Sequence, residues 1–379
     1  MKALYLHEIM VMENLLKNML LLLSRGEKAA LSSVISRSGS VPAPANSKLL
    51  VDSAGKIWGT VGGGALEGEV HHQAREVIAA ERPSIKSFDF QSDSLESALQ
   101  ICGGKITLYT EVIFPTAQEI AIYSTALEAI RASRTAALVT AVQTAYSERP
   151  PSGPRVLLGR EGVLAGSLAR PEWNRKLSEK AKEMFGQEDP LYLELAEKPA
   201  GCQHLAGFLI ELIHPAPALV IFGGGHIGVP LCRLGALCGF RVTVVDDRAE
   251  YADPARFPEA ERTLHSDFEK VFDSLEIGPR HYLVSVTRCH TTDRQVIGRA
   301  AGLPAAYIGM IGSRRKVKLL WEELERRGVE RVALERVHAP VGVEIGAETP
   351  EEIAVSILAQ IIQTRRDKKP GINQGSIRL

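Results

Sequence analysis

The sequence predicts an α/β protein in which an N-terminal α+β domain with an internal duplication precedes a C-terminal Rossmann-like, doubly wound parallel sheet. Three observations predict this class. Apolar strands alternate with helical segments after Pro217, several strand-like segments before it occur twice, and a glycine-rich turn follows the first C-terminal strand. The chain has 379 residues, too many for one ordinary core, and we place the domains at 1–215 and 216–379.

Charge and cysteine content narrow the classes of partner. Lys plus Arg and Asp plus Glu both number 45, so no net charge favours nucleic acid or an anionic membrane. The cysteines show neither a CxxC motif nor zinc-like spacing, which indicates free thiols in the cytoplasm and predicts no metal site. They are Cys102, Cys202, Cys232, Cys238 and Cys289.

The N-terminus contains a short apolar run at Met19–Leu23. Charged residues precede it, Arg25 follows it, and no cleavage site of small residues is present. These features predict an amphipathic first helix instead of a signal peptide or a membrane span.

The region before residue 215 repeats itself. Expected strands lie at 29–35, 48–52, 57–61, 87–90 and 105–113, with a helix at 66–80. Residues 136–138, 155–162 and 166–167 resemble 29–31, 48–55 and 59–60 at an offset of 107, and Glu211 repeats Glu111 at an offset of 100. We therefore predict diverged repeats at about 27–115 and 134–215. The second copy lacks the triple glycine and Glu67 of the first, so any chemistry is expected in the first copy.

Two features of the first repeat are candidate sites. Gly62, Gly63 and Gly64 precede Glu67 at the start of the expected helix, which is a backbone arrangement suited to phosphate. Cys102 is followed by two glycines, so its thiol is a candidate nucleophile. A buried, inert cysteine is the alternative for Cys102.

The glycine turn of the C-terminal domain has the sequence context of a phosphate site. Gly223, Gly225 and Gly228, with His226 between them, follow an apolar strand and open a helix. Asp246 ends the next strand 18 residues after Gly228, where it is placed to accept a hydrogen bond from a ribose hydroxyl. The alternative is a Rossmann fold whose site is vestigial.

Polar residues also follow the later strands of this domain, at the edge where ligands of parallel sheets bind. Asp293 is spaced to orient His290 if the first of these loops becomes helical. The second loop starts a helix with several cations, which indicates an anion site, with a solvated basic turn as the alternative. The candidates are Arg288, His290 and Asp293, and then Ser313, Arg314, Arg315 and Lys316.

These motifs together resemble the xanthine dehydrogenase accessory factor (XdhC/CoxI) family over nearly the whole chain. The resemblance is carried by residues 62–67, 102–104, 222–228, 245–248, 287–290, 307–316 and 338–359. It implies a non-enzymatic chaperone that binds the molybdenum cofactor (Mo-molybdopterin) and assists its sulfuration and insertion. It also implies as partners a molybdenum hydroxylase such as xanthine dehydrogenase, a cysteine desulfurase if the protein does not sulfurate the cofactor itself, and a homodimer with the first helix as a candidate contact.

The sequence departs from the family pattern at three places, one of them near Leu49, where many members have Met. Gly39-Ser40 is followed by Val-Pro-Ala where family members often carry Pro-Arg, and Ala65 stands where many have Cys. The remaining thiol candidates are Cys102 and Cys289.

Two other functions stay open at this stage. The glycine turn with Asp246 also fits an NAD(P)-dependent oxidoreductase, or a protein that binds another nucleotide, with His290 and Asp293 as an acid–base pair. A pure docking protein with a vestigial Rossmann site is the third alternative.

Overall fold

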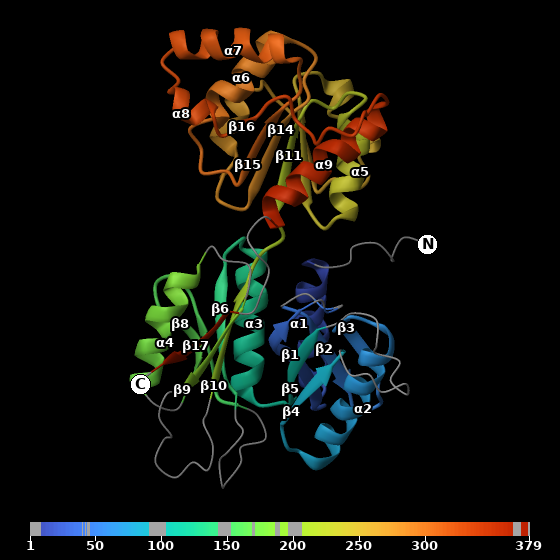
Figure 1. Cartoon of the computed structure of the whole chain (residues 1–379), viewed down its shortest axis with the longest axis vertical. Helices are drawn as coiled ribbons and strands as arrows, with labels where there is room; N and C mark the ends of the chain where they lie inside the picture. Colours follow the sequence, from blue (N-terminus) through green and yellow to red (C-terminus); the bar gives the residue numbers. More distant parts are fainter. Residues whose placement is uncertain are drawn as a thin grey trace. The chain divides into compact units, whose positions relative to one another are not determined.

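The computed structural model describes residues 9–39, 41, 43, 46–90, 104–142, 153–168, 171–185, 190–195, 207–366 and 373–377. The chain forms two compact units, one built mainly from Val11–Pro215 and the other from Ala216–Lys369. We call these the N-terminal and C-terminal units and describe each by itself (Figure 1).

The N-terminal unit contains two successive sets of elements in the same order, namely a helix, three strands, a helix and two strands. The first set is α1 (Ile9–Ser24), β1 (Ala29–Ser38), β2 (Lys48–Asp52), β3 (Ile57–Thr60), α2 (Gly64–Ala80), β4 (Ser84–Asp89) and β5 (Lys105–Ile113). The second set is α3 (Ala117–Arg131), β6 (Ala136–Val142), β7 (Arg155–Leu158), β8 (Val163–Ser167), α4 (Pro171–Met184), β9 (Leu191–Leu195) and β10 (Gly207–Ile213).

Each set forms its own sheet, and the two sheets share one strand order. The first sheet runs β3-β2-β1-β5-β4, and the second runs β8-β7-β6-β10-β9 with β17 (Asn373–Ile377) added in parallel beside β9. The equivalence extends to the preceding helices, because α1 precedes β1 as α3 precedes β6. The repeat seen in the sequence therefore corresponds to a repeated topology that includes one more helix than the sequence indicated.

Helix α1 is amphipathic, and its apolar side lies in the core of the N-terminal unit. Leu16 and Met19 are almost fully buried and pack with residues of α3 such as Ile122. Burial of several large apolar side chains stabilises this packing by about 1.5–3 kcal/mol per side chain. The apolar stripe of α1 is thus covered within the chain, and the expectation that it forms a dimer contact is wrong for these residues.

The C-terminal unit alternates strands and helices throughout. Its elements are β11 (Ala218–Phe222), α5 (Gly228–Leu237), β12 (Arg241–Asp246), β13 (Arg262–His265), β14 (His281–Ser285), α6 (His290–Ala300), β15 (Tyr307–Met310), α7 (Arg314–Arg326), α8 (Arg331–Leu334), β16 (Val337–His338) and α9 (Pro350–Arg366), with 3₁₀ helices at Ala249–Tyr251, Pro254–Arg256 and Lys270–Ser274.

The six strands of this unit form a parallel sheet in the order β13-β12-β11-β14-β15-β16. Successive residues of β11 point to opposite faces, so Leu219 and Ile221 pack with α5 and α9, whereas Val220 and Phe222 pack with α6 and α7. Figure 1 shows these helix pairs on opposite sides of the sheet. The predicted doubly wound fold is confirmed. The last helix, α9, begins with a capping box, since Glu352 Oε2 accepts from the Thr349 N–H and Thr349 Oγ1 accepts from the Glu352 N–H.

Candidate functional site

The glycine turn between β11 and α5 is closely packed except at its centre. A Cβ on Gly228 would lie 2.2 Å from the carbonyl oxygen of Gly223, and Gly223 itself has φ +115°. A Cβ on Gly225, by contrast, would have no atom within 4 Å. Gly223 and Gly228 are therefore required by the fold, whereas Gly225 leaves open space above the backbone, where a phosphate can approach.

Helix α5 begins at this turn without a side-chain cap. Its N-cap residue is Ile227, and no side chain accepts a hydrogen bond from its first turn among the described residues. An uncapped N-terminus presents backbone N–H groups and the positive end of the helix dipole. This arrangement is suited to binding a phosphate group.

Asp246, at the end of β12, is turned toward the protein. Its Oδ2 accepts from the Gly224 N–H (2.9 Å) and from Arg248 Nη2 (3.2 Å), and its Oδ1 accepts from Arg248 N and Nε (both 3.0 Å). The side chain is 1% exposed. A carboxylate accepts about four hydrogen bonds, so these donors fill it. The expectation that Asp246 accepts from a ribose hydroxyl does not fit this geometry.

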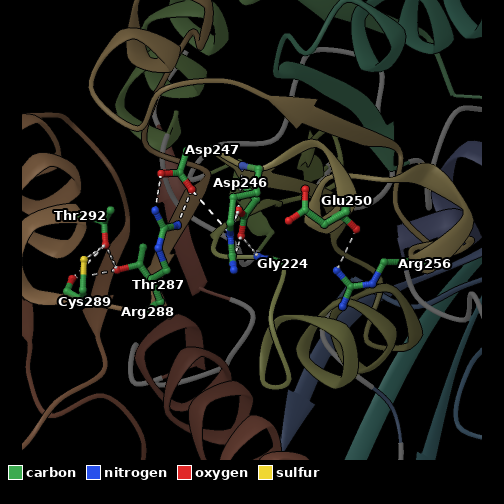
Figure 2. A network of polar contacts seen from close by, with 10 residues as sticks. Gly224, Asp246, Asp247, Glu250, Arg256, Thr287, Arg288, Cys289 and Thr292 are labelled. Carbon is green, nitrogen blue, oxygen red and sulfur yellow. Dashed lines mark hydrogen bonds and ion pairs between the residues drawn. The ribbon is translucent and has the colours of Figure 1, made fainter.

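Asp247 and Arg288 join the loops on either side of the glycine turn (Figure 2). Strands β12 and β14 are the two neighbours of β11, and Arg288 donates from Nη1 and Nη2 to the two carboxylate oxygens of Asp247 at 2.5 and 2.8 Å. These hydrogen bonds hold the pKa of the Asp247 carboxyl below its usual range. Arg288 is thus placed at the mouth of the turn, but it is paired with a residue of the same chain.

The polar residues at the start of α6 are arranged differently from the expected acid–base pair. Asp293 is fully buried and accepts from Ser285 Oγ, Thr287 Oγ1 and Lys316 Nζ. His290 lies with Nδ1 3.8 Å from Glu323 Oε2. The prediction that Asp293 orients His290 is therefore wrong, because the carboxylate faces the sheet and the imidazole faces α7.

Cys289 is an exposed thiol at the N-cap position of α6. Its Sγ lies 3.4 Å from Thr292 Oγ1. The Thr292 hydroxyl, followed by the Thr292 N–H, lowers the pKa of this thiol below its usual range. The loop that carries it also contacts the glycine turn, since a Cβ on Gly223 would lie 3.2 Å from the Cα of Thr287. Cys289 is therefore a candidate nucleophile in the loop beside the turn.

The basic residues at the start of α7 do not converge on one anion site. Ser313 caps the helix by accepting from the Lys316 N–H at 3.2 Å, and Lys316 Nζ points to Asp293. Arg315 is exposed, and Arg314 lines an open groove with Trp321. Of the four predicted residues, the structure thus brings only Lys316 into the polar network of the turn.

The glycine turn of the N-terminal unit lies at the start of α2, as predicted, with open space at Gly64 and an acidic side chain beside Gly63. Gly62, Gly63 and Gly64 all have positive φ, and a Cβ on Gly63 would lie 3.9 Å from Glu67 Oε2. The carboxylate already supplies the negative charge that a helix N-terminus favours. An incoming phosphate would meet a like charge here, in contrast to the turn at Gly225. Cys102 lies outside the described residues.

Sequence reasoning overlooked three contributors, namely Asp247, Arg248 and Thr292. The run Asp-Asp-Arg at the end of a parallel strand was a usable signal, because a carboxylate there often bonds the backbone two residues on. Within the part of the chain that the structure describes, no cluster of three or more His, Cys, Asp or Glu side chains could hold a metal ion. The described helices also include none long and apolar enough to span a membrane.

Two relatives and one solved structure resemble the chain over long stretches. The "Uncharacterized protein YqeB" of Escherichia coli (strain K12) is 30% identical over 59% of this chain, which spans only 42% of that relative's length. A probable xanthine dehydrogenase subunit of Bacillus subtilis (strain 168) is 26% identical over 91% of this chain and 96% of its own. The crystal structure of a xanthine dehydrogenase from Bacillus halodurans shares the fold, with a TM-score of 0.72, 21% identity and coverage of 94% and 96% of the two chains.

Two family models match consecutive parts of the chain. The model of the XdhC and CoxI family matches residues 22–89, and the model of the XdhC Rossmann domain matches residues 219–361, where the glycine turn and its neighbouring loops lie. Together they cover more than half of the sequence, in the order of the two units. The chain therefore belongs to the XdhC and CoxI family.

Proposed function

We propose that this protein is an accessory factor for the maturation of a xanthine dehydrogenase or a related molybdenum hydroxylase. In this role it binds the molybdenum cofactor by its phosphate and assists sulfuration and insertion of the cofactor. The observation that carries the proposal is the uncapped N-terminus of α5 beneath the open space at Gly225. Membership of the family and the names of the relatives support the choice of client.

The residues present fit the phosphate end of the cofactor. Backbone N–H groups of the glycine turn up to Gly228 would hold the phosphate, because the Val229 N–H already donates to Gly225 O and Pro230 has no N–H. Arg288, in the loop after β14, is a cation beside this turn. The bound cofactor would supply the molybdenum and dithiolene chemistry of the client enzyme. The chain's own part is to hold the phosphate and to shield the cofactor until transfer.

A thiol beside the phosphate site supports a role in sulfuration. Cys289 is exposed, and its lowered pKa favours the thiolate, which is the nucleophilic form. Cys102 remains a second candidate on sequence grounds. Whether the protein carries sulfur itself or receives it from a cysteine desulfurase is tested by activating the client with each cysteine variant in the presence and absence of that enzyme.

An NAD(P)-dependent oxidoreductase is the competing function, because the glycine turn has the complete strand–turn–helix context. Two observations weigh against it. The carboxylate of Asp246 is filled by protein donors, which disfavours the ribose hydroxyls of NAD. The predicted partner of His290, Asp293, is bonded elsewhere, and the carboxylate beside the imidazole is that of Glu323 on α7, 3.8 Å away.

The decisive experiment compares Gly225→Val with Gly302→Val. Both glycines have open space where a Cβ would lie, but Gly302 lies at the far end of α6 from its ligand-facing N-terminus. We expect Gly225→Val to lose both molybdopterin binding and activation of xanthine dehydrogenase, while Gly302→Val keeps both. Normal activation by Gly225→Val would instead indicate a docking protein with a vestigial site. Tight NAD(H) or NADP(H) binding with turnover, and no molybdopterin binding, would indicate the oxidoreductase.

A further inference from the structure

Arg248 is held in one position by two neighbours. Its guanidinium donates to both oxygens of Asp246, and its Cζ lies 3.5 Å from the centroid of the Tyr251 ring. The bidentate pair fixes the guanidinium plane, and the aromatic ring supports one face of it. The Arg248 side chain remains 30% exposed, whereas Asp246 beneath it is 1% exposed. A ligand that reaches Arg248 therefore meets its guanidinium and not the Asp246 carboxylate beneath it.

This corner is where a dinucleotide with a free ribose would need an acceptor. In a Rossmann domain the acidic residue that ends the second strand accepts from the ribose 2′-hydroxyl, whereas a nearby arginine accommodates a 2′-phosphate. Asp246 occupies the position of the acidic residue, but Arg248 supplies three of the four hydrogen bonds that fill its carboxylate. A ribose diol could bind to Asp246 only by displacing one of the charge-assisted hydrogen bonds from Arg248.

We propose that Arg248 is a specificity-determining residue that closes the crevice to NAD-type ligands and selects ligands that present an anionic group at this corner. This proposal rests on the proposed function only in taking the glycine turn as the phosphate site. The chemistry that fits this corner is a phosphate ester opposite the Arg248 guanidinium. A 2′-phosphorylated dinucleotide presents this group in addition to the pyrophosphate that the glycine turn would hold, whereas the single phosphate of a pterin cofactor would be held by the turn itself.

The discrimination follows from what each ligand gains and loses. The ribose hydroxyls of NAD⁺ lie opposite the Arg248 guanidinium, which has no acceptor for their protons. A hydrogen bond to a charged group contributes a factor of about 10 or more in affinity. A phosphate gains that contact without disturbing Asp246. The residue therefore gives the protein a way to keep the crevice clear of NAD.

The test measures binding of NAD⁺, NADP⁺ and inorganic pyrophosphate by isothermal titration calorimetry to the full chain. We expect the wild-type protein to bind NADP⁺ about tenfold more tightly than NAD⁺. In Arg248→Ala, Asp246 regains free acceptor positions, so NAD⁺ affinity should rise about tenfold, NADP⁺ affinity should fall, and pyrophosphate affinity should change by less than about threefold.

Arg256→Ala is the matched control, because Arg256 also lies over the Tyr251 ring (4.8 Å) but has Glu250 and not Asp246 as its hydrogen-bond acceptor. It should leave the order of the two dinucleotides unchanged. Arg248→Lys keeps the charge with fewer donors, so it should retain NADP⁺ binding and gain less for NAD⁺.

The proposal is overturned if the wild-type protein prefers NAD⁺, or if NAD⁺ affinity does not rise in Arg248→Ala. Should Arg248→Ala fail to fold, the wild-type preference and the Arg248→Lys variant decide by the same criteria. Molybdopterin binding is measured separately. If molybdopterin does not bind but the two dinucleotides bind in the expected order, the proposed function is rejected and this inference stands. If molybdopterin binds but the dinucleotides do not bind in the expected order, only this inference is rejected.

Discussion

Lys48 of β2 pairs with Glu211 of β10 inside the N-terminal unit, with Nζ and Oε1 2.7 Å apart. Arg155 of β7 pairs with Glu111 of β5 at 2.7 Å (Nη2–Oε2). The first residues of β2 and β7 are equivalent in the two repeats, and so are the two glutamates. Each repeat thus contributes the cation of one pair and the carboxylate of the other. These reciprocal ion pairs connect the two halves across their shared core.

Removing one partner of a reciprocal pair is expected to be costly. The side chains of Lys48 and Glu211 are 5% and 7% exposed, so Lys48→Met leaves a buried carboxylate without its cation. We expect a loss of about 3–5 kcal/mol in the free energy of unfolding, whereas Lys48→Met combined with Glu211→Leu should cost less than about 1 kcal/mol or stabilise the unit. Urea denaturation followed by tryptophan fluorescence measures both.

The signal can be confined to the N-terminal unit. A Trp321→Phe background removes the tryptophan of the C-terminal unit and leaves Trp58 and Trp173. Lys17→Met is the control, because Lys17 forms an exposed pair with Glu13 one turn away on α1 and should contribute about 0.3–0.5 kcal/mol. Equal losses of unfolding free energy in Lys48→Met and Lys17→Met would show that the buried pair stabilises the unit no more than the exposed pair does.

The sequence predicted the backbone of this protein better than its side-chain partners. Apolar periodicity located β11 and β12, and the glycine spacing located the turn after β11. Lys48 and Arg155 were recognisable in the sequence as equivalent positions of the two repeats, because each is a charged residue followed by apolar ones. Their partners were not predictable, because pairing across the repeats depends on how two sheets pack and not on local spacing.

The candidate site shows the same division. The positions of Asp246 and Asp293 at the carboxyl edge of the sheet were correct. Their roles were misjudged, because Arg248 folds back onto Asp246, and hydroxyls from the end of β14 satisfy Asp293. Residue spacing indicates which side chains can meet. The hydrogen-bond donors that fold onto each buried carboxylate decide which of these contacts form.

Cys289 should be the fastest-reacting of the three described cysteines. Hydrogen bonds from Thr292 lower the pKa of its thiol, whereas burial raises the pKa of Cys232 to about 12 and also raises that of Cys238. Because the folded-state pKa of Cys289 is depressed, its thiolate persists to lower pH than an ordinary thiol. The pH midpoint of iodoacetamide labelling, read for each peptide by mass spectrometry, should therefore be lowest for Cys289.

Thr292→Val removes the hydroxyl and keeps the shape of the side chain. It should move the labelling midpoint of Cys289 upward and leave Cys238 unchanged. An unchanged midpoint in Thr292→Val would show that the hydroxyl does not stabilise the thiolate.

Asp293 should matter for stability and His290 should not. Asp293 is fully buried and accepts from two hydroxyls and from Lys316, so Asp293→Ala leaves all three donors without their acceptor. We expect a loss of about 3–5 kcal/mol in thermal or urea unfolding of the C-terminal unit. His290 is 39% exposed, and His290→Ala should cost less than about 0.5 kcal/mol. Comparable losses in the two variants would contradict the assignment of Asp293 as the centre of this network.

The ion pair between Asp247 and Arg288 should compete with an anionic ligand for the arginine. The pair joins the loops that flank the glycine turn, and the Arg288 side chain is 44% exposed, so the guanidinium can exchange partners. Asp247→Asn weakens the internal partner and should raise pyrophosphate affinity about threefold, whereas Arg288→Gln should lower it by about the same factor. Both effects should shrink as NaCl screens the charges.

Arg299→Gln is the matched control for the loss of one positive charge. Arg299 also lies in an exposed pair, with Asp273, and its side chain is likewise 44% exposed, but it sits in the last turn of α6, away from the glycine turn. It should leave pyrophosphate affinity unchanged. If Arg288 exchanges partners, the guanidinium released in Asp247→Asn must bind pyrophosphate more tightly. Weaker pyrophosphate binding in Asp247→Asn would therefore show that the Asp247 carboxylate orients Arg288 toward the ligand and does not compete with the ligand.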